Sequence, residues 1–212
     1  MYLRKILDEV ELFRIMGGEP LLHPNVIDFV KIYREVFPNG RLALVTNGLL
    51  LPKFIKTYSK EINALNCEIH ITSYPTFKQK LSKYKKLLKK NSVKFNITSN
   101  STFYRHIDLI QEQLAQKAFD YCRKYFHCPA LKNGKVYQCS GLAYINIFNN
   151  YFNLDIEEPN SFNIMDENIV YSGLVDFINS PNKLCKNCFY RQEGFSWGKS
   201  ERKISEWVIN TK

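Results

Sequence analysis

Four cysteines in the C-terminal half of the sequence, Cys128, Cys139, Cys185 and Cys188, have the spacing of a metal site. The Cys185-Lys-Asn-Cys188 segment places two thiolates on one turn, and a glycine-containing hairpin expected over 131–140 brings Cys128 opposite Cys139. Four thiolates suit a four-iron four-sulfur cluster and a tetrahedral zinc ion alike. This clustering is more typical of cofactor binding in a reducing compartment than of a disulfide framework.

The other two cysteines have simpler interpretations. Cys122 lies on a helix expected over 108–126 and is interpreted first as a buried thiol, with replacement of one of the four ligands as the alternative. Cys67 lies on the apolar face of an expected strand, where core packing explains it.

The second candidate site is Gly17-Gly18-Glu19, at the C-terminal end of the first expected strand, where α/β sheets bind ligands. Two glycines allow the backbone to approach a ligand closely, and the Glu19 carboxylate can accept hydrogen bonds from an amino group. An ordinary strand-to-loop turn is the alternative interpretation. The segment lacks the spacing of a Walker loop or of a dinucleotide fingerprint, so those two phosphate-binding motifs are excluded.

Short apolar strands alternate with helices from residue 11 to residue 99, which predicts repeated βα units around a parallel sheet. The expected strands are 11–16, 41–46, 67–74 and 93–99, and the expected helices are 25–37, 52–65 and 76–91. Polar and apolar residues alternate in the last two strands, so that one of them carries Glu68, His70, Thr72 and Tyr74 on one face. If the apolar faces meet the helices, the polar faces line the interior of the sheet, which implies a bound ligand.

The periodicity changes after residue 100, where a long helix, the hairpin and a stretch rich in Tyr, Phe and Asn follow one another. We therefore expect a soft boundary between residues 100 and 118. The two predicted domains are residues 1–110, an α/β region, and residues 111–212, a small cysteine-rich region.

The segment 17–24, GGEPLLHP, is followed one βα unit later by 45–48, VTNG, and this pair of motifs resembles the radical SAM superfamily. The resemblance covers most of the chain. It implies a partial (β/α) barrel that lacks its first strand, with S-adenosylmethionine (SAM) lying across the strand ends. It also implies that Gly17, Gly18 and Glu19 hold the methionine amino group of SAM. Asn47 and Ser73 are further cofactor-binding candidates because of their positions near strand ends.

The C-terminal cysteines resemble the SPASM/twitch extensions of radical SAM proteins, in which four cysteines hold an auxiliary four-iron four-sulfur cluster. The resemblance therefore favours an iron–sulfur cluster over zinc at the four cysteines. Softer similarity to a subgroup associated with surface-polysaccharide gene clusters implies a carbohydrate-linked substrate.

In the family, a CxxxCxxC loop ahead of the Gly-Gly-Glu strand holds the cluster that cleaves SAM to a 5′-deoxyadenosyl radical. Residues 1–16 contain no cysteine. We therefore interpret the sequence as N-terminally truncated and expect no SAM cleavage by this chain alone. The expected partners are an upstream chain or segment that supplies the loop and a reductant such as flavodoxin or ferredoxin.

Two other function classes fit parts of the sequence. A noncatalytic iron–sulfur or zinc-binding module would dock a partner that supplies the missing strand, because an unpaired sheet edge favours pairing. An RNA-binding protein would use the lysines of 78–90 in a chain whose net charge is +10. Apolar residues at helical spacing make those lysines the outer face of an amphipathic helix. We therefore interpret them first as a solvated face, with a nucleic-acid or lipid surface as the less favoured alternative.

No apolar run reaches the roughly 18 residues of a membrane span, and the start of the chain does not read as a secretory leader. We therefore expect a cytoplasmic location and no membrane contact.

Overall fold

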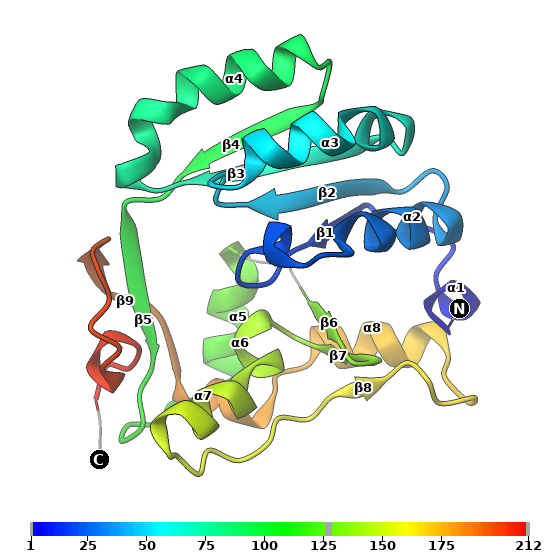
Figure 1. Ribbon diagram of the computed structural model, residues 1–212. Helices are drawn as coiled ribbons and strands as arrows, with labels where there is room; N and C mark the ends of the chain where they lie inside the picture. Colours follow the sequence, from blue (N-terminus) through cyan, green and yellow to red (C-terminus); the bar gives the residue numbers. More distant parts are fainter. Residues whose placement is uncertain (1, 126–128, 211–212) are drawn as a thin grey trace. The chain divides into compact units, whose positions relative to one another are not determined.

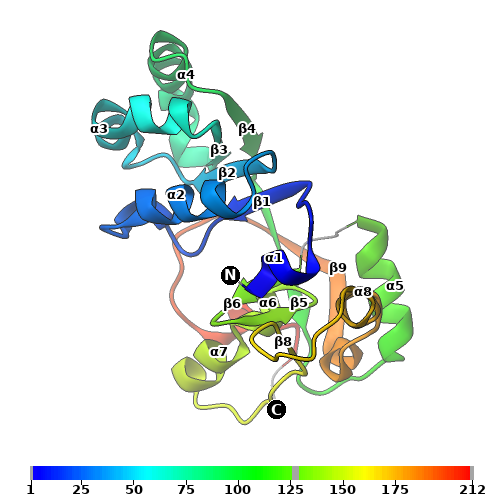
Figure 2. The same ribbon diagram turned by 90° about the vertical axis from the view of Figure 1, so that its right-hand side faces the viewer.

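The computed structural model describes residues 2–125 and 129–210, and for residues 190–193 it describes the backbone only. The chain divides into two compact units, of which the first is Leu3–Ser101 and the second begins at Thr102 (Figures 1 and 2). No helix in the described part of the chain is long and apolar enough to cross a membrane.

The first unit is a mixed α/β structure built on one parallel sheet. The strands β1 (Leu12–Ile15), β2 (Arg41–Thr46), β3 (Cys67–Ser73) and β4 (Phe95–Ser99) neighbour one another in chain order. The helices are α1 (Tyr2–Ile6), α2 (Val26–Val36), α3 (Leu51–Ala64) and α4 (Leu81–Lys90), with short 3-10 turns η1 (Pro20–Leu22) and η2 (Pro75–Lys80). The expected α/β class and all four expected parallel strands are confirmed; the barrel remains a prediction.

The helices α2, α3 and α4 cover one face of this sheet (Figure 1). The sequence folds this way because each helix presents an apolar stripe, such as Tyr84 and Leu88 of α4, to the alternate residues of the strands. In β3 the covered side chains are Cys67, Ile69, Ile71 and Ser73, all at most 2% exposed. Cys67 is therefore a core residue, as expected.

The opposite face of the sheet carries polar groups on β3 and β4. The Glu68 carboxylate is held by a bidentate contact with Arg41 at 3.1–3.3 Å and by Nε2 of His70 at 2.9 Å. Burial opposes ionisation of Glu68, but these two partners lower the pKa of its carboxyl below the usual value. Register places Asn96 beside His70 and Thr98 beside Thr72. The expected separation of a polar face from a helix-covered face is confirmed for β3.

The described residues of the second unit, 102–125 and 129–210, form two antiparallel sheets and four helices. β5 (Thr102–Ile107) pairs with β9 (Cys188–Ser196), while β6 (Ala130–Lys132), β7 (Lys135–Tyr137) and β8 (Phe162–Asn163) form the other sheet. The helices are α5 (Ala115–Tyr125), α6 (Ser140–Ala143), α7 (Ile145–Phe152) and α8 (Tyr171–Asn179), with 3-10 turns η3 (Lys183–Asn187) and η4 (Ile204–Glu206).

The expected hairpin is β6–β7. Its turn residues Asn133 and Gly134 both have positive φ angles, 50° and 73°, as a tight hairpin turn between twisted strands requires. The expected helix over 108–126 begins only at Ala115, and the strand β5 ahead of it was not predicted.

Candidate cofactor sites

Glu19 lies beyond the C-terminal end of β1 and binds the neighbouring end of β2. Its Oε1 accepts hydrogen bonds from the Thr46 hydroxyl at 2.7 Å and from the Leu21 backbone N–H at 3.1 Å. Its Oε2 accepts one from the Asn47 backbone N–H at 2.8 Å. A carboxylate has about four acceptor positions, so roughly one, on Oε2, remains for a ligand.

Gly17 and Gly18 border this carboxylate in sequence, and the chain's own structure does not require glycine at either position. Both are exposed, neither has a positive φ angle, and a Cβ built on either one would meet no atom within 4 Å. Open space of this kind beside a fixed anion can admit a ligand with an amino group. A glycine demanded by packing or by backbone geometry would instead show a close neighbour or a left-handed conformation.

The loop after β2 shapes the same edge. The Asn47 side chain accepts a hydrogen bond from the Leu49 N–H at 2.9 Å, and the Thr46 hydroxyl accepts one from the Gly48 N–H at 3.0 Å. Gly48 has φ +82°, and a Cβ there would lie 2.6 Å from the Phe77 ring. Glycine at position 48 is therefore structural, in contrast to Gly17 and Gly18.

Ser73, the last residue of β3, and Tyr74, which follows it, have different surroundings. Ser73 is on the helix-covered face, 1% exposed, and its hydroxyl has no hydrogen-bond partner among the described residues. Tyr74 lies close enough to Glu19 that burial first, and then the Glu19 charge, raise the pKa of its phenol. The structure thus brings Glu19, Thr46 and Asn47 together at one sheet edge. Thr46 and Tyr74 were not among the candidates from sequence.

In the second unit, the segments that carry three of the expected cysteines are joined by buried side-chain hydrogen bonds. Cys139 precedes α6, and its neighbour Gln138 accepts a hydrogen bond through Oε1 from Asn182 Nδ2 at 3.2 Å. Asn182 is fully buried and caps η3, the turn that carries Cys185 and leads into Cys188. The Cys185 N–H donates to the Asn182 carbonyl at 2.9 Å.

The helix α5 and the residues just ahead of it are hydrogen-bonded to both of these segments. The Arg123 guanidinium donates to the carbonyls of Gln138 at 3.3 Å and Ile178 at 2.7 Å. The Gln113 side chain, just ahead of α5, donates to the Cys188 carbonyl at 2.6 Å. Because Cys122 is on α5, these bonds hold its helix against the other cysteine-bearing segments.

The thiols of these segments interact electrostatically. Burial raises the pKa of Cys188 to about 12, and Cys139, Cys122 and Cys185 act on it in the same direction. Burial also raises the pKa of Cys185, with further increases from Cys139 and Cys122 and opposing effects from the Asn182 backbone and Arg123. Thiolates that act on one another in this way repel, so a bound cation would favour their ionised form.

Cys128, one of the four expected ligands, lies outside the described residues. Among the residues that are described, no three or more His, Cys, Asp and Glu side chains form a group in a metal-binding arrangement. The thiols of Cys122, Cys139, Cys185 and Cys188 are near enough to influence one another's pKa without forming such a group. The sequence interpreted Cys122 first as a buried thiol; the structure places it with the other cysteines.

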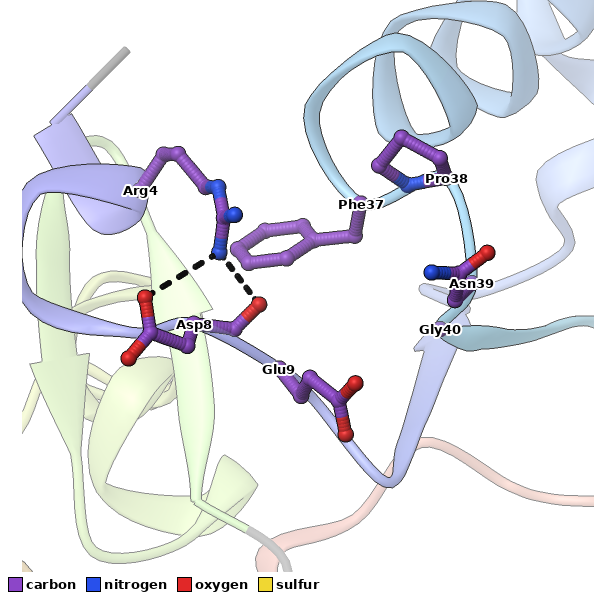
Figure 3. A pocket seen from close by; sticks show the side chains of 7 residues that line it. All are labelled: Arg4, Asp8, Glu9, Phe37, Pro38, Asn39 and Gly40. Carbon is purple, nitrogen blue, oxygen red and sulfur yellow. Dashed lines mark hydrogen bonds and ion pairs between the residues drawn. The ribbon is translucent and has the colours of Figure 1, made fainter.

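A cavity of about 170 Å³ lies at the opposite end of the first unit's sheet, before β2 begins (Figure 3). Its lining includes Arg4, Asp8, Glu9 and Phe37, and Arg4 forms a hydrogen bond and an ion pair with Asp8. None of the cofactor-binding candidates lines it.

Parts of the chain match known proteins, although no protein-family model matches it. It is 36% identical over 66 residues to the GTP 3′,8-cyclase of Microcystis aeruginosa, which is 31% of this chain and 20% of that protein. It is 35% identical over 80 residues to the FeMo cofactor biosynthesis protein NifB of Methanocaldococcus jannaschii, which is 32% of this chain and 27% of that protein. A third relative, the GTP 3′,8-cyclase of a Sulfurovum species, is 41% identical over 54 residues, or 25% of this chain and 17% of its own.

GTP 3′,8-cyclases and NifB are radical SAM enzymes. The matched part of this chain is therefore similar to part of these radical SAM enzymes. The chain spans about a quarter or less of the length of these radical SAM relatives. This similarity implies the cofactors of radical SAM enzymes, a four-iron four-sulfur cluster and SAM, and it leaves the substrate open.

Proposed function

We propose that this chain is a SAM-binding part of a radical SAM enzyme, with SAM held at the Gly17–Glu19 edge of the first unit. The observation that carries the proposal is the Glu19 carboxylate, fixed by three hydrogen bonds with one acceptor position left beside two uncrowded glycines. The methionine ammonium of SAM would donate to that position. When bound to a reduced cluster, SAM supplies a 5′-deoxyadenosyl radical that modifies the substrate.

Binding can be tested without turnover, by isothermal titration of the whole chain with SAM and with 5′-methylthioadenosine. The second compound keeps the adenosine and sulfur of SAM but lacks its amino acid portion. SAM is expected to bind at least about tenfold more tightly, because a charge-assisted hydrogen bond to a part-buried carboxylate contributes about 1.5–3 kcal/mol. Equal affinities would contradict a role for Glu19.

Cleavage of SAM requires a cluster ligated near Glu19, and residues 1–16 offer no cysteine for it. We therefore propose that an upstream chain or segment supplies the CxxxCxxC loop and that a flavodoxin- or ferredoxin-like reductant supplies the electron. The isolated chain should release no 5′-deoxyadenosine under reducing, anaerobic conditions. Release of 5′-deoxyadenosine from it would overturn this part of the proposal.

The edge of strand β1 opposite β2 and the neighbouring flank of helix α2 suggest where such a segment would dock. β1 is the last strand of the sheet, with β2 as its strand partner among the described residues, so its other edge can accept a strand. The helix α2 is tied to the end of α3 on one flank, where Arg34 donates to the Leu65 carbonyl at 2.9 Å. Phe29 and Ile32 lie roughly 140–160° around the helix from Arg34.

Phe29 is 48% exposed and Ile32 is 46% exposed, so the flank of α2 that faces away from α3 is apolar and uncovered. A strand added to β1 and a helix packed on Phe29 and Ile32 would together form one more βα unit. Without it, the edge should promote self-association. Sedimentation of the wild-type chain should show oligomers, and F29K/I32K should shift them toward monomer. A matched I147K/Y151K variant, altered at exposed apolar residues of α7, should leave the oligomers unchanged. A monomeric wild-type chain would contradict the proposal that a segment docks on β1 and α2.

For the second unit we propose a four-iron four-sulfur cluster, with zinc and a noncatalytic docking module as the alternative. Two sets of four ligands are considered, and both contain Cys139, Cys185 and Cys188. Cys122 is proposed as the fourth ligand because Arg123 of its helix, and Gln113 just ahead of that helix, are hydrogen-bonded to the two other cysteine-bearing segments. Cys128 is the fourth ligand that the spacing predicts. The chemistry of the donors fits either metal.

Metal analysis after anaerobic reconstitution separates these possibilities. About four irons and four sulfides per chain would support the cluster, and zinc alone would favour the alternative. C122S should lose most of the metal while C128S keeps it, with C67S as the control in the first unit. Loss of the metal in C128S and its retention in C122S would instead identify Cys128 as the fourth ligand.

A further inference from the structure

The lysine surface of the first unit is formed by seven exposed side chains of η2 and α4: Lys78, Lys80, Lys83, Lys85, Lys86, Lys89 and Lys90. None of them forms an ion pair with a described residue, and the sequence has no Asp or Glu between Glu68 and Asp108. Their charge is therefore not neutralised by neighbours along this stretch of chain.

The fold turns these lysines outward as a set. Tyr84 and Leu88, 5% and 0% exposed, fix the inner side of α4 in the core. At about 100° per residue, the five lysines of α4 occupy an arc of roughly 160° centred opposite that inner side. The remaining polar groups of the surface, such as Gln79 and Ser82, are neutral donors and acceptors.

The lysine density along α4 suits one kind of partner. Lys83 to Lys90 span seven steps of 1.5 Å, so five positive charges lie within about 10 Å, or one per ~2 Å. A nucleic-acid duplex carries one negative charge per ~1.7 Å of its axis. Lysine, serine and glutamine are side chains that contact phosphate oxygens, and no exposed aromatic or large aliphatic residue lies among 78–90 to stack on bases or insert into lipid.

We propose that the lysine surface binds the phosphate backbone of a nucleic-acid duplex, independently of base sequence. This function is separate from SAM binding and does not depend on it. An anionic membrane fits less well, because the apolar side of α4 is committed to the core and cannot enter a bilayer.

The test uses the whole 212-residue chain, a fluorescent 20-base-pair duplex, and a salt series from 50 to 200 mM. About five phosphate contacts predict a slope near −4.5 in log K against log salt, or a loss of roughly 500-fold across the series. The variant K83Q/K86Q/K90Q should reduce the slope by about 2.7. The variant K53Q/K56Q/K60Q is the matched control, since it removes three exposed lysines with the same spacing from α3.

Selective loss of duplex binding in the α4 variant, with circular dichroism unchanged, supports the proposal. Equal losses in both variants would overturn it, because net charge alone would then explain the binding. A slope near zero would also overturn it. Tighter binding to vesicles of phosphatidylserine and phosphatidylcholine than to the duplex would overturn it in favour of a membrane surface.

Discussion

Replacing Glu19 with glutamine should destabilise the first unit even when no ligand is present. The carboxylate joins the end of β1 to the end of β2 through Thr46 and Asn47, and it also caps η1 through Leu21. Glutamine keeps one carbonyl oxygen and puts an NH₂ group where the second acceptor was. At least one of the three donors then faces another donor.

The expected loss follows from the three bonds. A hydrogen bond to a charged acceptor contributes about 1.5–3 kcal/mol, and a part-exposed site justifies the lower end or less. Allowing for the one oxygen that remains, E19Q should reduce the free energy of unfolding by about 2–3 kcal/mol. Urea denaturation at pH 7, followed by circular dichroism, measures this as a lower midpoint with an unchanged slope.

Glu35 provides the matched control, because it is an exposed carboxylate on α2 that forms no hydrogen bond or ion pair within the described part of the chain. E35Q should change the free energy of unfolding by less than about 0.5 kcal/mol. If E19Q and E35Q were equally stable, the carboxylate would not hold the two strand ends together, and the reasoning about its remaining acceptor position would fail.

Three further results are expected from the same urea assay. R34M should cost about 2–3 kcal/mol, because Arg34 donates to carbonyls at the ends of α2 and α3, and R34K should recover less than half of that since lysine cannot span them. G48A should cost at least about 2 kcal/mol, from the left-handed backbone and the overlap with Phe77; wild-type stability would contradict that overlap. Burial opposes ionisation of Asp108, but backbone N–H groups and Asn210 hold its pKa below the usual value. Its ionised carboxylate therefore contributes to the free energy of unfolding above the unfolded pKa of about 3.9, and this contribution is lost as pH falls through the folded pKa. D108N should therefore be less stable than wild type at pH 7, with a difference that shrinks toward pH 2; a constant difference would refute the linkage.

Local sequence patterns predicted the first unit well because its elements are set by short-range periodicity. Alternation of apolar residues located all four strands, and the 3.6-residue period located α2, α3 and α4 to within a few residues, apart from the 3-10 turn η2 at the start of the last helix. The second unit depends more on contacts between distant residues. β5 was missed because its partner β9 lies more than eighty residues later, and a local pattern does not reveal such pairing.

The start of α5 was predicted too early for a local reason. Asp108 Oδ1 accepts hydrogen bonds from the N–H groups of Ile110 and Gln111 at 2.8 and 2.9 Å, which forms a turn in competition with helix. Aspartate favours such turns, so the residue type was a signal that the periodicity outweighed.

In the candidate sites, too, local motifs were predicted from the sequence, whereas contacts between distant residues were not. The Gly-Gly-Glu motif identified Glu19 directly. Thr46 was missed because its contact with Glu19 depends on the register that sets Ile15 beside Leu44. Cys122 was given a secondary role because its nearness to Cys185 and Cys188 depends on the packing of α5 against η3.

The most direct test of SAM binding at the glycine pair compares G18V with G198V by isothermal titration. A Cβ at either glycine meets no atom within 4 Å and neither glycine has a positive φ angle, so neither substitution is strained at Cβ. Urea denaturation of both variants first establishes that they fold as wild type does. If SAM occupies the space beside Glu19, G18V should weaken SAM binding at least tenfold, about 1.4 kcal/mol, while G198V binds as wild type does. Unchanged SAM affinity in a stably folded G18V would contradict the central claim.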